Sequence, residues 1–311
     1  MRTKTGNKGR KILAIFASDI HLRETAPECR TDDFFLAQLN KLRWLKQLQE
    51  QNNCPVLIAG DLFHKWKPSP WLLGFALREL PDKCVCIPGQ HDLPAHNLEQ
   101  IEKSGIEVLA SAGKITLLEP ARSLQVRGED FSIIGFPWGI ELENCKRNGR
   151  FKIALIHKLI YKAKEPPFPG AEEVGSTAKA LAKKLSGFDV IVTGDNHQTI
   201  FETYGETTVV NCGSFMRSTA AQVDHEPSVF VLYDDFVVKR LSLPFPKGVI
   251  SREHIDKVQE KDERIAAFAE RLSARIEIGL SYASNMEKYI AKNKISKSVQ
   301  SIIWRAIDGK K

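Results

Sequence analysis

Five short segments of the sequence place aspartate, histidine or glutamine directly after an apolar run. They are Asp19 with His21, Asp61 with His64, Gln90 with His91 and Asp92, His157, and Asp195 with His197. These segments hold five of the eight histidines, which a random scatter would rarely produce. Oxygen and imidazole ligands without thiolate favour Mn²⁺, Mg²⁺, Fe²⁺ or a mixed pair over structural zinc. Two such ions, roughly 3.5–4 Å apart, clamp the attacking and leaving oxygens of a phosphoryl displacement, so the pattern predicts metal-assisted phosphoester hydrolysis.

The elements that must position these side chains follow an α/β pattern. Apolar runs predict strands at 11–18, 55–59, 83–87, 151–156 and 188–193, and helical periodicity predicts helices at 32–51 and 70–80. Strands that alternate with helices predict a largely parallel sheet. Open sheets of this kind bind ligands at the carboxyl ends of their strands, where each segment falls. Gly60 allows the tight turn that points Asp61 out of its strand.

The rest of the chain predicts a second sheet and a helical tail. Short alternating strands with hairpins are expected at 115–118, 123–126 and 131–134, and further strands at 199–203, 207–211, 228–233 and 236–241. Residues 164–175 predict an exposed loop before a helix that ends near Ser186. The tail carries apolar stripes at Ile265, Phe268, Leu272 and Ile276 and at Val299, Ile302, Ile303 and Ala306. We therefore expect a basic disordered leader at 1–10, one domain at 11–247 and a helical extension at 248–311.

Composition and charge limit the class of protein. With 311 residues, of which 42% are hydrophobic and 27% charged, the chain can bury a full core. No apolar stretch approaches the length that spans a bilayer. Six cysteines without a C-x-x-C pair predict reduced thiols in a cytoplasmic protein. The net charge of +7 lies at the ends, because residues 1–11 carry five bases and residues 279–311 carry seven bases and two acids. Such ends predict a polyanionic partner, unless they only keep the protein soluble.

The five segments also resemble, in order, the motifs of the calcineurin-like metallophosphoesterase superfamily. The matching stretches are Ser18–Leu22, Gly60–His64, Gly89–Asp92, His157 and Gly194–His197. The resemblance covers residues 11–242 and implies a four-layer α/β/β/α sandwich, to which the helical extension is added. Two further features are similar to the SbcD-type DNA-repair exonucleases of bacteria and phages. They are His64 with Lys67-Pro68-Ser69 behind it, and the Asn211-Cys212-Gly213-Ser214 turn before Arg217.

The resemblance implies a centre of two divalent metal ions. One ion would be held by Asp19, His21 and His197 and the other by Gln90, His157 and Asp195, with Asp61 bridging them. A hydroxide activated by both ions would be the nucleophile. Two residues depart from the family pattern, which has asparagine in place of Gln90 and histidine in place of Asp195. The extra carboxylate favours Mn²⁺ or Mg²⁺ over zinc.

The resemblance assigns three further residues to catalysis. His91 would donate a proton to the leaving oxygen or stabilise its charge, and Asp92 would fix the tautomer of His91. His64 would lie near the phosphate and orient His91 or the DNA backbone.

The leading hypothesis is a Mn²⁺-dependent DNA exonuclease. The same residues fit a small-substrate phosphodiesterase or phosphatase of the superfamily. A metal-deficient scaffold or binding protein is expected if Gln90 and Asp195 mark lost metal affinity. The expected partners are DNA, an SMC-like ATPase subunit of the SbcC type docked on the C-terminal helices, and a second copy of the chain, but no membrane. A basic arm would contact DNA through Lys288, Lys292, Lys294 and Lys297, unless the helices only pack on the core.

Overall fold

The computed structural model describes residues 10–125, 130–162, 175–253, 264–266 and 282–308. The chain divides into two compact units, Met1–Ser251 and Arg252–Lys311. The predicted leader up to residue 9, the predicted loop at 164–174 and the stripe residues Phe268, Leu272 and Ile276 lie outside the described residues. All five motif segments belong to the first unit.

Two six-stranded sheets form the centre of the first unit. The first has the order β14-β13-β1-β2-β3-β4, with β1 (Ile12–Ala17), β2 (Val56–Ala59), β3 (Cys84–Ile87), β4 (Ile115–Leu117), β13 (Ser228–Tyr233) and β14 (Val238–Ser242). The second has the order β11-β12-β10-β7-β6-β5, with β5 (Ser123–Gln125), β6 (Phe131–Phe136), β7 (Phe151–His157), β10 (Val190–Gly194), β11 (Ile200–Tyr204) and β12 (Thr207–Asn211). The motif-bearing strands β1, β2 and β3 run parallel to one another, as do β7 and β10. Within each sheet the motif residues therefore share one edge.

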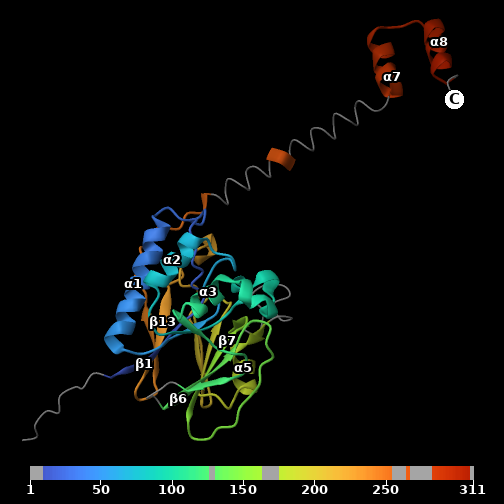
Figure 1. Cartoon of the computed structure of the whole chain (residues 1–311). Helices are drawn as coiled ribbons and strands as arrows, with labels where there is room; N and C mark the ends of the chain where they lie inside the picture. Colours follow the sequence, from blue (N-terminus) through green and yellow to red (C-terminus); the bar gives the residue numbers. More distant parts are fainter. Residues whose placement is uncertain (1–9, 126–129, 163–174, 254–263, 267–281, 309–311) are drawn as a thin grey trace, which may run out of the picture. The chain divides into compact units, whose positions relative to one another are not determined.

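Helices cover the outer face of each sheet. They are α1 (Phe34–Asn52), α2 (Pro70–Glu79) and α3 (Gly105–Ser111) on the first sheet and α5 (Ala178–Lys184) on the second (Figure 1). The local sequence sets where two of them begin. Asp33 Oδ1 accepts a hydrogen bond from the Leu36 N–H at 2.9 Å, and Ser69 Oγ accepts one from the Leu72 N–H at 3.1 Å. Both residues are N-caps of the usual types.

Shorter elements fill the connections. They are the 3₁₀-helices Gln90–Asp92, Pro94–His96, Leu98–Lys103 and Ala220–Gln222 and the small sheet of β8 (Ile160–Tyr161) and β9 (Ser176–Thr177). The first of these helices follows β3 directly and carries three of the predicted site residues.

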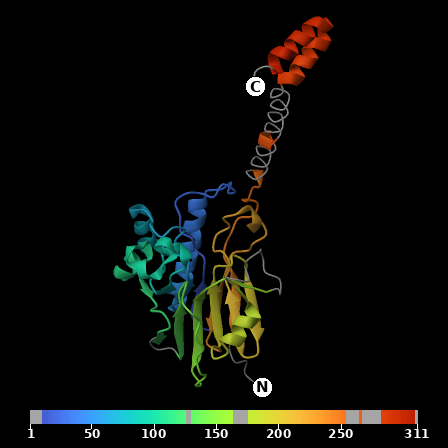
Figure 2. The ribbon, with the colours of Figure 1, turned by 90° about the vertical axis from the view of Figure 1, so that its right-hand side faces the viewer.

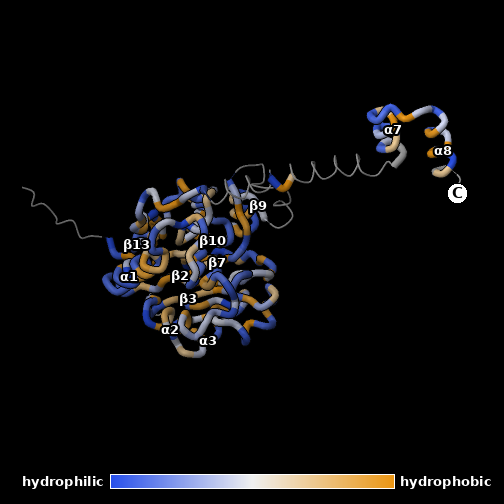
Figure 3. The backbone as a smooth tube through the Cα atoms, turned by 90° about the horizontal axis from the view of Figure 1, so that it is seen from above, coloured by the Kyte–Doolittle hydropathy of each residue, from blue (hydrophilic) through white to orange (hydrophobic). Residues whose placement is uncertain are grey.

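Three apolar cores separate four layers. The first lies between the helices α1 to α3 and the first sheet and contains Leu42 and Phe75, the second lies between the sheets and contains Leu57 and Val192, and the third contains Leu181 of α5. Figure 2 shows the blue-to-teal helices of the first sheet on one side of the green and yellow strands. Figure 3 shows hydrophobic stretches of β2, β3, β7 and β10 in the middle of the unit. The predicted α/β/β/α sandwich is confirmed.

One region of the first unit differs from the prediction. The sequence after residue 105 favoured short strands of a second sheet with hairpins, but Gly105–Ser111 forms α3 and β4 joins the first sheet, parallel to β3. Ser104 caps α3 by accepting from the Glu107 N–H at 3.4 Å, and Ile106 and Leu109 lie in the first core. Tertiary packing of these two side chains decides the element, since seven residues are too few to be helical alone.

The second unit contains two described helices, α7 (Tyr282–Lys292) and α8 (Lys297–Asp308). Ile290 on α7 is buried, whereas the exposed fraction of Ile302 on α8 is 66%. The docking of an SMC-like ATPase on these helices stays a prediction. Among the described residues, no helix combines the length and the apolar character needed to cross a lipid bilayer.

Candidate metal centre

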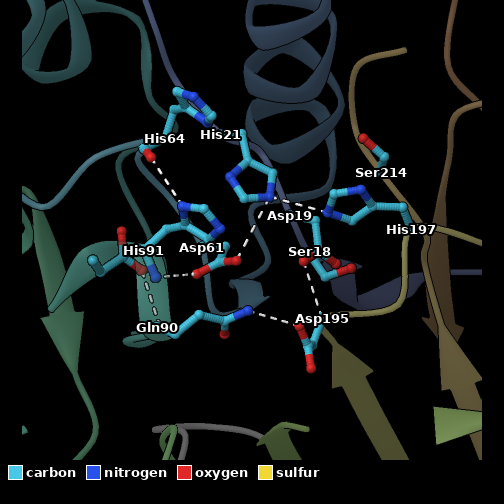
Figure 4. Close-up of polar contacts among 12 residues, drawn as sticks. Ser18, Asp19, His21, Asp61, His64, Gln90, His91, Asp195, His197 and Ser214 are labelled. Atoms are coloured by element: carbon cyan, nitrogen blue, oxygen red, sulfur yellow. Dashed lines mark hydrogen bonds and ion pairs between the residues drawn. The ribbon is translucent and has the colours of Figure 1, made fainter. Parts of the chain in front are cut away.

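Four of the predicted metal ligands have left-handed backbone conformations just beyond their strands. The angle φ is 49° at Asp19, 48° at His21, 53° at Asp61 and 85° at Asp195. Residues with a Cβ atom rarely adopt this region, and they keep it where the surrounding structure demands it, commonly at functional sites. These turns bring side chains that follow β1, β2 and β10 toward a common centre (Figure 4).

Asp19, His21 and His197 form the first ligand group. One donor atom from each residue lies within 4.8 Å of the others, and the two imidazole Nε2 atoms are 3.1 Å apart. Within the described part of the chain, Oδ2 of the fully buried Asp19 has no hydrogen-bond partner, and neither has Nδ1 of His21. Burial of an unpaired carboxylate oxygen is costly. A cation held by this group would remove that cost.

Asp61 lies between the first ligand group and the second. Its Oδ2 is 3.6 Å from Nε2 of His21 and 3.5 Å from Nε2 of His157. Its Oδ1 accepts a hydrogen bond from the backbone N–H of His91 at 2.9 Å. One oxygen of this carboxylate therefore faces both groups, which is the place that a bridging ligand requires.

The second ligand group contains Gln90, His157 and Asp195, and hydrogen bonds join its members. His157 directs Nδ1 at the Ala59 carbonyl oxygen, 2.7 Å away, and Nε2 at Gln90 Oε1, 2.6 Å away. Gln90 Nε2 donates to Asp195 Oδ1 at 2.7 Å. The two residues that depart from the family pattern thus bind each other, across 105 positions in the sequence.

Burial and charge act in opposite directions on the histidines of the two groups. Burial lowers the pKa of His21 to about 3 and also lowers the pKa of His197, so both imidazoles are neutral at pH 7. Burial opposes a charge on His157 as well, but Asp61 and then Asp19 overcome it and raise the pKa of His157 to about 10. Both ring nitrogens of His157 face acceptor oxygens, as a protonated ring requires.

The two central carboxylates also differ. Burial, opposed by His157 and reinforced by Asp61, raises the pKa of Asp19 to about 8. Burial acts in the same direction on Asp61, but the neighbouring His157 and His21 hold its pKa well below the usual range. Asp61 is therefore the permanent negative charge at the centre.

His64 and His91 lie beside the first group. Their rings stack with centroids 5.7 Å apart, and the His91 ring centroid is 4.9 Å from that of His21. His91 Nδ1 is 3.0 Å from the His64 carbonyl oxygen, as Figure 4 shows. The backbone of His64 therefore orients the ring of His91.

The predicted role of Asp92 is wrong. Its carboxylate does not hold the ring of His91 but accepts hydrogen bonds from the backbone N–H groups of Leu62, Phe63 and Gly89, at 2.9–3.1 Å. The side chain points back under the end of β2, because the 3₁₀ turn directs Asp92 into the interior, where it is 0% exposed. Asp92 thus supports the backbone that follows Asp61.

Two glycines leave room for the ligands. A Cβ atom on Gly60, whose φ is +86°, would lie 2.1 Å from Nδ1 of His157, and one on Gly89 would lie 2.2 Å from Oδ1 of Asp61. Both contacts are with rigid or central groups, so larger residues would displace the ligands themselves.

The turn after β12 supports the site from outside it. Asn211 Nδ2 donates to the carbonyl oxygens of Asn196 and Gln198, on either side of His197. Arg217 donates to the carbonyl oxygens of Val223 and Pro246, so its guanidinium anchors the following loop. The sequence singled out this turn, whereas it held no signal for the bond between Gln90 and Asp195.

One comparison with known proteins, the match to a family model, agrees with this geometry. The family model of the calcineurin-like phosphoesterases matches residues 13–199, the span that contains Asp19 to His197. No curated protein matches the chain.

Three similar solved structures share 12–13% identity with the chain. An archaeal phosphodiesterase has a TM-score of 0.38 at 12% identity, over 74% of this chain and 99% of that chain. A phosphopantetheinyl hydrolase of Mycobacterium tuberculosis has 0.45 at 13% identity, over 75% and 96%. A sulfate thiohydrolase of Thermus thermophilus has 0.44 at 13% identity, over 78% and 58%. On the match of the family model, the chain belongs to the calcineurin-like phosphoesterase family.

Proposed function

We propose that the chain is a divalent-metal-dependent phosphodiesterase that acts on DNA, as an exonuclease similar to the SbcD type. Members of this family hydrolyse phosphoester bonds and use divalent metals. The observation that carries the proposal is the convergence of two ligand groups on Asp61, with His91 and His64 directly beside them.

The residues present fit two divalent ions. Asp19, His21 and His197 would hold one and Gln90, His157 and Asp195 the other, with Asp61 shared. The buried Oδ2 of Asp19, which has no hydrogen-bond partner among the described residues, is suited to bind a cation. Carboxylate and amide oxygens suit Mn²⁺ or Mg²⁺. When bound, such ions supply positive charge to phosphate oxygens and lower the pKa of water.

His91 is placed to transfer a proton to the leaving oxygen. A carbonyl oxygen can only accept a hydrogen bond, so the 3.0 Å contact with His64 O assigns the hydrogen to Nδ1 of His91. Nε2 is then the atom that faces substrate. In the protonated ring it donates to the leaving oxygen, and the charge of the ring stabilises the negative charge that develops there.

The cationic residues that follow His64 support DNA as the substrate. Its side chain is half-buried against His91, and the exposed Lys65 and Lys67 follow it directly. Cations next to the reacting centre favour a polyanionic substrate over a small neutral leaving group.

The test compares substrates and variants in the presence of Mn²⁺. We expect the wild-type protein to release nucleotides from linear DNA faster than it hydrolyses bis-p-nitrophenyl phosphate. We expect His91→Ala to lower kcat by roughly 10²–10⁴-fold, the usual contribution of a positioned acid, while elemental analysis finds the metal still bound.

His96→Ala is the matched control, because His96 is an exposed histidine outside the cluster. Full nuclease activity in His91→Ala would contradict the role of His91. Rapid hydrolysis of the small diester with DNA left intact would instead favour a small-substrate phosphodiesterase. Fewer than one bound metal ion per chain would favour a binding protein.

A further inference from the structure

A small pocket opens next to the metal centre on the side of His64. Its volume is about 220 Å³, and its lining includes Arg23, Lys65, Lys67, Glu24 and His64. None of these residues except His64 belongs to the predicted site.

The backbone holds this pocket in a fixed relation to the metal centre. Beyond β1 and β2 the two chains continue side by side, with Leu22 N–H bonded to Leu62 O at 2.8 Å and His64 N–H bonded to Leu22 O at 3.1 Å. The residue after Leu22 therefore lies next to His64. Gln38 holds the backbone of Arg23 from both sides, at 3.2 and 3.3 Å. The position of Arg23 thus does not depend on its own side chain.

The pocket carries an excess of positive charge. It has three cations and one acid, and that acid, Glu24, is already bonded to the hydroxyl of Ser69. The guanidinium of Arg23 donates to Thr25 Oγ1 at 3.1 Å, but its Nε is buried and has no acceptor in the described part of the chain. A planar guanidinium with unused donors is suited to a phosphate.

The charge of the pocket acts on His64. Burial, followed by the positive charges of Arg23, His91 and Lys65, lowers the pKa of His64 to about 4. His64 is therefore neutral at pH 7, and the pocket attracts anions through Arg23 and the lysines.

A second, larger pocket on the other side of the centre has a different character. Its volume is about 720 Å³, and its lining includes Asp195, His197, Asp224, Glu226 and Arg240. With three acids and one arginine, this side suits a group without phosphates. The two sides of the metal centre therefore differ in the sign of their charge.

We propose that the pocket of Arg23, Lys65 and Lys67 binds the phosphate next to the scissile phosphate in an oligonucleotide strand. This inference rests on the proposed function and deepens it. Hydrolysis of one phosphoester needs only the metal centre and His91, so a separate cationic pocket serves a substrate with at least two phosphates. The phosphate bound in the pocket belongs to the leaving strand. The reason is that the pocket lies beside His64 and His91, where the leaving oxygen departs in the proposed mechanism. The shared chemistry of the ligand is a second phosphate, supplied either by the next phosphodiester or by a diphosphate group.

The test measures kcat/KM for TpT, which has one phosphate, and for TpTpT, which has two. We expect Arg23→Ala to lower the ratio of TpTpT to TpT by about tenfold or more, the usual cost of a lost charged hydrogen bond. Arg23→Lys should recover part of the ratio, and Lys67→Ala should lower it less. A dinucleoside diphosphate in place of TpTpT shows whether a diphosphate group is preferred, which would overturn the oligonucleotide assignment.

Arg122→Ala is the matched control, because the side chain of Arg122 is 71% exposed and pairs only with Glu119 in the described residues. Equal losses on TpT and TpTpT would overturn the proposal, since Arg23 would then act through His64 and His91. An unchanged ratio would overturn it as well.

Metal-free binding separates this proposal from the proposed function. Fluorescence anisotropy measures the binding of labelled TpTpT in EDTA, where no hydrolysis is needed. We expect Arg23→Ala to bind TpTpT more weakly. The slope of the logarithm of the binding constant against the logarithm of the salt concentration should become shallower by roughly 0.7 for each phosphate contact that is lost. If the wild-type protein hydrolyses neither oligonucleotide, the proposed function fails. If it hydrolyses both and Arg23→Ala changes neither the ratio nor the binding, only the pocket fails.

Discussion

The two ligand groups of the metal centre contain similar residues but are arranged differently. In the group of Asp19, His21 and His197, buried donor atoms converge, and Oδ2 of Asp19 has no hydrogen-bond partner among the described residues. In the other group, Gln90 bonds both His157 and Asp195, and these bonds occupy the donor atoms. In the first group only the 3.1 Å contact between Nε2 of His21 and Nε2 of His197 must give way to a cation. The second must exchange internal hydrogen bonds for metal bonds.

The protonation states of the histidines also differ between the two ligand groups. His21 and His157 are both buried, yet the pKa of His21 falls to about 3 and that of His157 rises to about 10. Burial and Asp61 act on both rings, but Asp19 and Asp195 reinforce Asp61 at His157, whereas three other histidines oppose it at His21. Burial alone does not set the charge of a ligand.

The largest effect is expected from Asp61→Asn, because Asp61 faces both groups. We expect kcat to fall by about 10³-fold or more, which is about 4 kcal/mol of transition-state stabilisation, with weaker binding of both ions. Kinetics and elemental analysis measure the two effects. Asp235→Asn, at a carboxylate on the turn between β13 and β14, is the control. Loss of only one ion would show that the groups do not share Asp61.

A smaller effect is expected from Asp195→Asn, which separates the two groups. The amide oxygen still accepts from Gln90, so the substitution removes the charge and keeps the hydrogen bond. We expect the affinity of the second ion to fall by about 10–100-fold and that of the first by less than about threefold. Calorimetric titration with Mn²⁺ measures both affinities. Equal losses at the two sites would remove the distinction between the groups.

The pH dependence of metal binding gives the smallest effect. A ligand that carries a proton in the free protein must release it, so affinity rises with pH, by up to about tenfold per unit for each proton, until the pKa of the ligand is passed. For the first group this rise should level off near the pKa of Asp19, about 8. For the second it should continue toward the pKa of His157, about 10. Titrations from pH 6.5 to 9 in two buffers test this, and parallel curves would contradict it.

Local sequence was sufficient to predict most strands and helices and the segments of the site, whereas the four layers followed from the resemblance to the metallophosphoesterases. Apolar runs such as Val56–Ala59 can only be buried strands, and the polar residues after them must lie at the strand ends. Where the signal was weak the prediction failed, because the seven residues of α3 acquire their helix from packing in the first core.

Local sequence pattern placed the candidate ligands at the carboxyl ends of strands, and parallel pairing brings them to one edge within each sheet. The packing of the two sheets then brings the two edges together. Only the tertiary structure decided what each side chain does there. It turned Asp92 to the backbone under β2, joined Gln90 to Asp195, and placed Arg23 beside His64. These contacts join residues 29, 105 and about 40 positions apart, and they depend on how the sheets, turns and rotamers are packed together, which no local pattern encodes.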